Sequence, residues 1–166
     1  MQVAVWRIAR KPYALDRDGG GAKEAGGRWN RPGTGVVYAG ASVSVVALEK
    51  FVHLVGVVPA DLVLVRLDLP ENFSEEVLDQ PPRGWNLTPP EAVSMDLGTV
   101  WAQEKRSLAL KVPSVLVPEE YNILLNPEHT EFSEVLMTIV RPFAYDLRMY
   151  GERISPSRRL VFRPKS

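Results

Sequence analysis

The sequence contains no cysteine among its 166 residues. This absence excludes disulfide bonds, cysteine-ligated zinc and a thiol nucleophile, and it agrees with a reducing compartment. The chain also lacks any apolar run near the ~20 residues that a membrane-spanning helix needs, and its first residues do not follow the pattern of a secretory signal. We therefore expect a cytoplasmic protein that makes no contact with a membrane.

Net charge is lacking as well, because 20 lysine and arginine residues balance 20 aspartate and glutamate residues. A neutral chain produces no overall field that would attract nucleic acid or an anionic membrane, so we expect no direct nucleic-acid binding. Hydrophobic residues make up 45% of the chain and charged residues 24%, as in ordinary globular proteins. A chain of this length most simply forms one domain.

Strand-like and helix-like segments follow one another in a mixed order. Two helices are predicted, at 43–55 with Ser42 as N-cap and at 91–106 with an interruption at Gly98 left open. Hydrophobic alternation and short buried runs predict strands at 3–8, 35–39, 61–69, 108–112, 121–125 and 135–141. This order predicts a single compact α+β domain and not a doubly wound sheet.

Two long segments interrupt the predicted elements. Residues 10–34 are rich in glycine without periodicity and are predicted as an irregular loop, which is uncommon unless it is functional or disordered. Residues 70–90 are rich in proline and are predicted as a loop with at most a short helix near 74–79. The domain is expected to cover 1–150, and the basic residues at 151–166 are expected to form a flexible tail.

The most informative segment is Gly-Gly-Arg-Trp-Asn at 26–30. From Gly21 the glycine spacing is that of a P-loop, but Arg28 and its neighbours stand where that motif requires Lys followed by Ser or Thr. The dinucleotide fingerprint fails too, because Glu24 occupies the place of its third glycine. Arg28 is either a surface arginine or a guanidinium fork for phosphate oxygens, with glycines that let a ligand approach.

Aromatic and acidic residues nearby have two interpretations each. Trp29 is expected to be a core anchor, and Tyr38 is either a core tyrosine with a bonded hydroxyl or a flat surface for a ligand ring. Glu49 lies in a valine-rich helical stripe, which makes it a candidate for a buried carboxylate in a pKa environment suited to catalysis. Alternatively, Glu49 forms an ordinary helical pair with His53.

Serine and histidine chemistry is weakly indicated. Ser114 follows a predicted strand, where serine is commonly a turn residue. A Ser-His-carboxylate hydrolase would need Ser114, Glu49 and one of His53 and His129, but no G-x-S-x-G element is present. The two histidines lack the spacing of a metal site, so no metal is expected.

Taken in order, several segments resemble the RES domain, the toxin half of a bacterial toxin–antitoxin pair, which is named for its Arg, Glu and Ser. The resemblance extends over nearly the whole chain apart from the tail, and its order and spacing are more specific than any segment alone. The matching segments are WRI at 6–8, GGRWN at 26–30, VVYAG at 36–40, ALEKFVH at 47–53, KVPSVLVPEEYNILLNPEH at 111–129 and RPFAYDLRM at 141–149.

The resemblance implies that the catalytic residues of the family correspond to Arg28, Glu49 and Ser114. Ser107 is a nearby competitor for the serine, and Ser114 is preferred because it lies in the Val-Pro-Ser element. The resemblance also implies a fold similar to that of ADP-ribosyltransferases, with NAD as substrate and no further cofactor. The implied reaction cleaves the nicotinamide–ribose bond, with water, phosphate or a protein side chain as acceptor.

The same resemblance implies a set of substrate-binding residues and a protein partner. Arg28 and Ser114 would hold the pyrophosphate or ribose, Tyr38 would stack on nicotinamide, and His53 and Asn126 match recurring polar positions. Glu49 would stabilise the oxocarbenium-like ribose, as carboxylates do in glycosidases. The partner would be an Xre-like helix-turn-helix antitoxin that covers the active site, forms a hetero-oligomer with this chain and supplies the DNA binding. A protein ADP-ribosyltransferase and a non-catalytic nucleotide-binding or interaction module remain alternatives.

Overall fold

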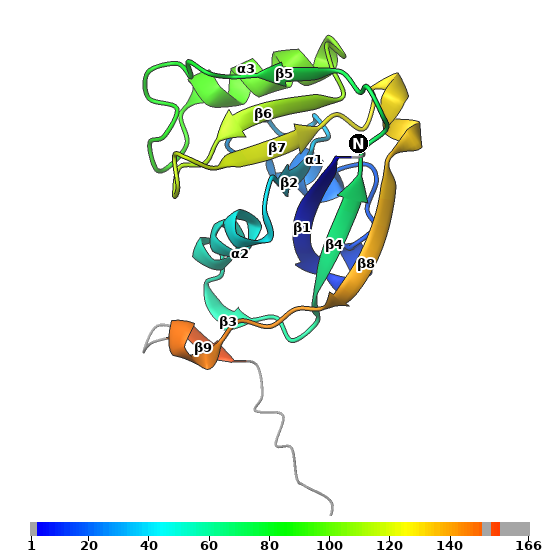
Figure 1. Cartoon of the computed structure of the whole chain (residues 1–166). Coiled ribbons are helices and arrows are strands. Elements are labelled where there is room, and N and C mark those ends of the chain that lie inside the picture. Colours follow the sequence, from blue (N-terminus) through cyan, green and yellow to red (C-terminus); the bar gives the residue numbers. More distant parts are fainter. Residues whose placement is uncertain (1–2, 151–153, 157–166) are drawn as a thin grey trace, which may run out of the picture.

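The computed structural model describes residues 3–150 and 154–156. Within these residues, the main element is a mixed sheet of seven strands (Figure 1). Its strands follow the order β5-β6-β7-β2-β1-β4-β8; β5 and β6 are parallel, and the other neighbours are antiparallel. The strands are β1 (Ala4–Arg10), β2 (Val37–Gly40), β4 (Leu62–Asp68), β5 (Glu75–Val77), β6 (Ala109–Pro113), β7 (Tyr121–Leu125) and β8 (Leu136–Pro142). The predicted α+β class is confirmed.

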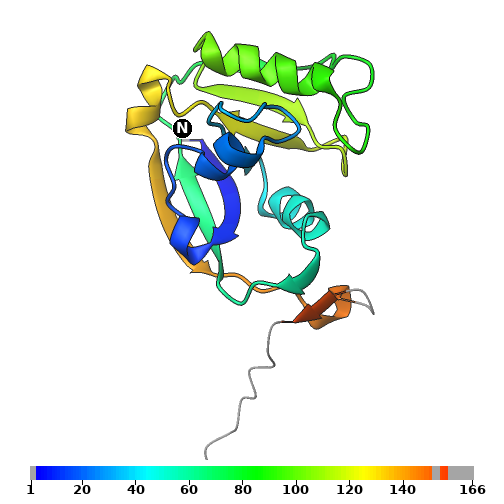
Figure 2. The same ribbon diagram turned by 180° about the vertical axis from the view of Figure 1, so that it is seen from behind.

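Helices and a small second sheet complete the domain. The α-helices are α1 (Gly20–Ala25), α2 (Val43–Val52) and α3 (Ala92–Gln103), and short 3-10 turns lie at Lys11–Tyr13, Thr130–Glu134 and Leu147–Met149. Strand β3 (Gly56–Val58) pairs in parallel with β9 (Ile154–Pro156). Helix α3 runs alongside β6 in both views, and α1 lies on the side of the sheet that Figure 2 brings to the front. In the part of the chain that the structure describes, no helix has the length and apolar character to span a membrane.

The large sheet consists of two halves that meet at a narrow junction. Strands β1 and β4 are paired along seven residue positions, whereas β1 and β2 share a single one, Trp6 with Gly40. In Figure 1, β1, β4 and β8 run across the direction of β6 and β7. The sheet therefore folds over a core to which both halves contribute, including Val5, Val65 and Ile123.

Helix α2 begins directly at this junction. Ser42 caps it as predicted, because its hydroxyl accepts a hydrogen bond from the backbone N–H of Val45 at 3.2 Å. Val45 and Val46 are buried, and a Cβ on Gly40 would lie only 2.5 Å from the Val46 side chain. Gly40 thus lets α2 pack directly on the end of β2, which positions the rest of the helix over the sheet.

Helix α3 is continuous, so the interruption considered at Gly98 is absent. Gly98 is buried, and a Cβ there would lie 1.9 Å from the carbonyl oxygen of Trp29. The glycine is therefore needed for close approach of the helix to the 26–30 segment, not for a break in the helix. Trp29 is almost completely buried, and its prediction as a core anchor is confirmed.

Two loop predictions are corrected by the structure. Residues 75–77 form β5 and not a short helix, because they pair with β6 and the neighbouring Ser74 carbonyl accepts from the Ala109 N–H. The 10–34 segment is not wholly irregular: Gly19, in the left-handed region at φ 63°, precedes α1. Of the predicted tail, the structure describes 154–156 as β9; the basic residues beyond lie outside the described residues.

Candidate functional site

The side chain of Glu49 is the centre of the candidate site. It projects from α2 and is half-buried, and its Oε1 atom accepts two hydrogen bonds from residues far away in the sequence. The Ser114 hydroxyl donates at 2.7 Å and the Asn122 side-chain amide at 2.8 Å. No hydrogen bond reaches Oε2 from the described residues. The carboxylate is therefore held through one oxygen, and its other oxygen is left to interact with a ligand.

Ser114 is completely buried just beyond β6, and its hydroxyl is fully engaged. Besides donating to Glu49, its Oγ accepts from the backbone N–H groups of Leu116 and Val117 at 3.1 and 3.2 Å. These contacts make Ser114 a support for the carboxylate, whereas the resemblance implied contact with substrate. Because the hydroxyl donates directly to a carboxylate and not to a histidine, the Ser-His-carboxylate hydrolase is not assembled.

Arg28 ties the 26–30 segment to the proline-rich loop. Its Nη1 donates to the carbonyl oxygens of Trp85 and Leu87, each at 2.8 Å, and the Trp85 ring stacks on Trp29 with centroids 5.9 Å apart. Burial lowers the pKa of the Arg28 guanidinium, and the charge of Glu49 opposes this change. An arginine remains charged in this setting. Within the described ranges, its Nε and Nη2 make no hydrogen bond and are left for an anion.

Tyr38, on β2, connects the sheet to the 26–30 segment. Its hydroxyl donates to Asn30 Oδ1 at 2.8 Å and accepts from the Trp29 N–H at 3.0 Å. Burial raises the pKa of Tyr38, so the hydroxyl stays protonated. A Cβ on Gly27 would lie 2.6 Å from this hydroxyl, which explains a glycine beside Arg28. The hydroxyl of Tyr38 is therefore hydrogen-bonded, as the core interpretation predicted, and its side chain is partly buried against the core cluster of Trp29 and Val36.

The substitution Tyr38→Phe is expected to lower the free energy of unfolding by about 1–3 kcal/mol, because it removes the hydroxyl partner of the Trp29 backbone N–H and of the Asn30 side-chain oxygen Oδ1. Urea denaturation followed by tryptophan fluorescence measures the change. Tyr13→Phe is the matched control, since Tyr13 is 62% exposed and should tolerate the loss of its hydroxyl. A Tyr38→Phe protein as stable as the control would contradict this role.

Three other residues considered from the sequence lie outside this cluster. His53 is exposed at the C-terminal cap of α2, and no ion pair joins it to Glu49 in the described part of the chain. Asn126 is 1% exposed; its amide donates to the Ala102 carbonyl and its oxygen accepts from the Glu128 N–H. Ser107 is likewise buried, where it accepts from the indole of Trp101. Asn126 and Ser107 therefore use their polar groups to hold the fold together.

In the part of the chain that the structure describes, no group of three or more His, Asp or Glu side chains could hold a metal ion. His129 instead caps a 3-10 turn, with its Nδ1 accepting from the backbone N–H of Glu131 at 3.3 Å. Its role in this structure is local.

Asn122 is the residue that sequence reasoning missed. It lies in β7, paired with Gly40 of β2 on one side and Val112 of β6 on the other. Paired residues of neighbouring strands have their side chains on the same face of the sheet, and helix α2 packs on this face. An asparagine within a strand of otherwise apolar residues was the available signal, because asparagine is depleted in strands.

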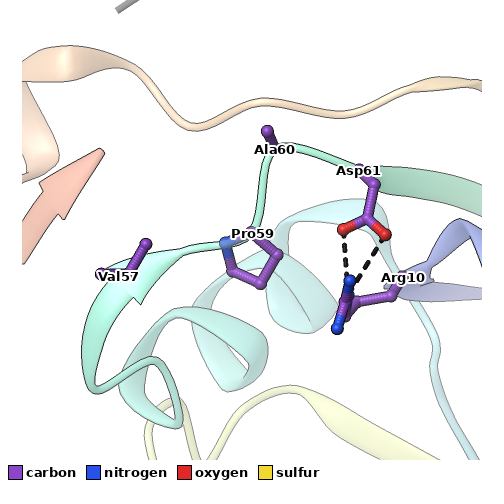
Figure 3. Close-up of a pocket in the computed structure, with 5 residues that line it drawn as sticks. All are labelled: Arg10, Val57, Pro59, Ala60 and Asp61. Carbon is purple, nitrogen blue, oxygen red and sulfur yellow. Dashed lines mark hydrogen bonds and ion pairs between the residues drawn. The ribbon is translucent and has the colours of Figure 1, made fainter. Parts of the chain in front are cut away.

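A pocket of about 470 Å³ lies elsewhere, next to β3 (Figure 3). Its lining is Arg10, Val57, Pro59, Ala60 and Asp61. Arg10 and Asp61 face each other in a two-pronged ion pair with Nε–Oδ distances of 3.0 and 3.1 Å. None of the side chains around Glu49 lines this pocket, and an exposed ion pair of this kind contributes little to stability.

Comparisons of the sequence with known proteins found matches over most of the chain. The sequence matches the RES domain family over residues 4–148. A relative from Sphingobium sp. (strain YBL2), called Prs ADP-ribosylating toxin, is 42% identical over 157 residues, which cover 90% of this chain and 98% of the relative. A relative from Yersinia enterocolitica, called Toxin Res, is 39% identical over 152 residues, with 87% and 98% covered.

Among solved structures, the toxin–antitoxin complex MbcT–MbcA of M. tuberculosis contains a similar chain. The TM-score is 0.62 at 14% identity, and 86% of each chain is covered, so the likeness concerns the fold. The family match covers most of the present chain, and the relatives are matched over almost their full length. The chain therefore belongs to the RES-domain family of toxins.

Proposed function

We propose that this protein is a toxin that consumes NAD by breaking the bond between nicotinamide and ribose. The observation that carries the proposal is the Glu49 carboxylate, whose Oε1 accepts two hydrogen bonds while its Oε2 accepts none from the described residues, with the charge of Arg28 close by. A fixed carboxylate is suited to stabilise positive charge that develops on a sugar ring. The name of the Sphingobium relative, an ADP-ribosylating toxin, supports the same chemistry.

In the proposed reaction, the C1′–N bond of NAD breaks and its electron pair leaves with nicotinamide. Glu49 stabilises the resulting oxocarbenium-like ribose until an acceptor attacks C1′. Arg28 binds the pyrophosphate through Nε and Nη2, the nitrogens that make no hydrogen bond within residues 3–150 and 154–156. The ring of Tyr38, which is partly buried against the core, would offer its accessible part as a surface on which nicotinamide can stack. If water is the acceptor, the product is ADP-ribose. If phosphate is the acceptor, the product is ADP-ribose that carries the phosphate on C1′.

Transfer of ADP-ribose to a protein is the second candidate. The observation that favours it is again the relative at 42% identity, whose name describes ADP-ribosylation of a target. The bond cleavage and the role of Glu49 are the same in both candidates. They differ only in the nucleophile that attacks C1′, which the residues around Glu49 do not select.

The proposal includes a protein partner. We infer an antitoxin that binds this chain, of the Xre-like helix-turn-helix kind, and the solved complex with a similar fold supports such a hetero-oligomer. DNA binding would belong to the antitoxin, in keeping with the zero net charge of this chain. The proposed activity assigns the protein to the cytoplasm, where NAD is available.

The test is to incubate the purified protein with NAD, with and without phosphate, and to measure free nicotinamide. We expect nicotinamide release together with one ADP-ribose product, and a matched sample with labelled NAD and cell extract reports transfer to a protein. Label on a protein with little free ADP-ribose would favour the transferase. Binding of NAD without turnover, unchanged in Glu49→Gln, would overturn the proposal and indicate a non-catalytic module.

A further inference from the structure

We propose that Asn122 is a positioning residue for Glu49, whose amide holds one carboxylate oxygen so that the other is presented to the ribose. The inference rests on the proposed function and deepens it. The contact that carries it is the 2.8 Å hydrogen bond from Asn122 Nδ2 to Glu49 Oε1, between residues 73 positions apart in the sequence.

The backbone determines the position of Asn122. Strand β7 lies inside the sheet, between β6 and β2, and Asn122 is paired with Val112 on one side and Gly40 on the other. A residue held by pairing on both sides has little freedom to move, unlike a residue in a loop. Helix α2, which carries Glu49, starts three residues after Gly40 and contacts β7. The same strand pairing therefore sets the positions of both the donor and the helix that carries the acceptor.

The chemistry of the two donors makes the arrangement directional. Because a carboxylate can only accept, Asn122 must turn its NH2 group and not its oxygen toward Glu49. The Ser114 hydroxyl already accepts from two backbone N–H groups, so its proton is also directed at Glu49. Both donors converge on Oε1 and are neutral, so they orient the carboxylate without neutralising its charge. Two donors on one oxygen fix the rotation of the carboxylate more firmly than one.

The kinetic test compares Asn122→Ala with the wild-type protein in the nicotinamide-release assay. A misplaced catalytic group lowers the rate of the chemical step, so we expect kcat to fall roughly 10- to 100-fold while KM stays within about threefold. Ile123→Ala is the matched control: it removes a buried side chain from the next residue of β7, outside the Glu49 cluster. This control should lower the melting temperature and leave kcat within about twofold of wild type. An Asn122→Ala protein with the wild-type kcat would overturn the proposal while the proposed function stands.

A second measurement needs no activity. Asn122→Asp places a carboxylate at hydrogen-bond distance from Glu49, and the repulsion should lower the melting temperature at neutral pH. Adding Glu49→Gln should restore most of that loss, because the amide of the new glutamine can donate to the new aspartate. If the double variant loses the sum of the single losses, the contact does not exist and the proposal fails. The two claims are therefore tested separately. A wild-type protein that releases no nicotinamide would refute the proposed function, whereas the melting temperatures of the three variants test the contact between Asn122 and Glu49.

Discussion

Glu49→Gln is expected to slow nicotinamide release severely and to abolish toxicity while the protein remains folded. Glutamine has the same shape, and its oxygen can still accept from Ser114 and Asn122, so the melting temperature should change little. What is lost is the negative charge, and removal of one group that stabilises transition-state charge costs about 10²–10³-fold in rate. The measurements are the initial rate of nicotinamide release and the growth of cells after induction.

The matched control for this prediction is Glu119→Gln, which removes an exposed carboxylate from the turn between Ser114 and β7. The overall charge change is the same in both variants, so a general electrostatic effect would appear in both. We expect the control to retain wild-type activity. A Glu49→Gln protein that still arrests growth, or retains more than a tenth of the rate, would remove Glu49 from its proposed role.

Gly98→Ala is expected to destabilise the fold strongly. The added Cβ would lie 1.9 Å from the carbonyl oxygen of Trp29, which is backbone and cannot rotate away as a side chain could. Overpacking of a core commonly costs about 1–3 kcal/mol, and a collision with backbone belongs at or above the upper end of that range. Alanine is otherwise favoured over glycine in a helix by about 0.5–1 kcal/mol. Gly98→Ala is therefore expected to lower the free energy of unfolding, although helix propensity alone would raise it.

Thermal unfolding followed by circular dichroism measures this effect. Val100→Ala is the control in the same helix, because Val100 is 44% exposed and its replacement should be nearly neutral. Since Trp29 follows Arg28, any Gly98→Ala protein that folds should also show weaker NAD binding. A variant with wild-type stability would mean that α3 does not approach the 26–30 segment as closely as described.

Local pattern predicted most elements. The strand at 121–125 and the Ser42 N-cap are confirmed because alternation and capping depend on neighbouring residues alone. The prediction of a loop with at most a short helix near 74–79 was wrong, because β5 forms through its pairing with β6, more than thirty positions away in the sequence. From the sequence, Gly98 was considered a possible helix interruption. The structure shows instead that glycine is needed there because α3 contacts the backbone of Trp29, a contact that no local pattern predicts.

Candidate site residues were identified by resemblance. The structure places some of them close to Glu49 and others elsewhere in the fold. Arg28, Tyr38, Glu49 and Ser114 belong to one connected region, whereas Asn126 is committed to the fold and His53 lies at the exposed end of α2. Asn122 was absent from the prediction because a single polar residue in a strand is equally consistent with a solvated edge.

The sequence alone determined the α+β class, the family resemblance and a short set of candidate residues, because these depend on composition, periodicity and motif order. Only the tertiary structure decided how those residues are used. It directs Ser114 and Asn122 to the same oxygen of Glu49 and engages one nitrogen of Arg28 with the Trp85–Leu87 loop. These partners lie 57 to 73 positions apart in the sequence, and local patterns cannot indicate which distant donor and acceptor the folded sheet brings together.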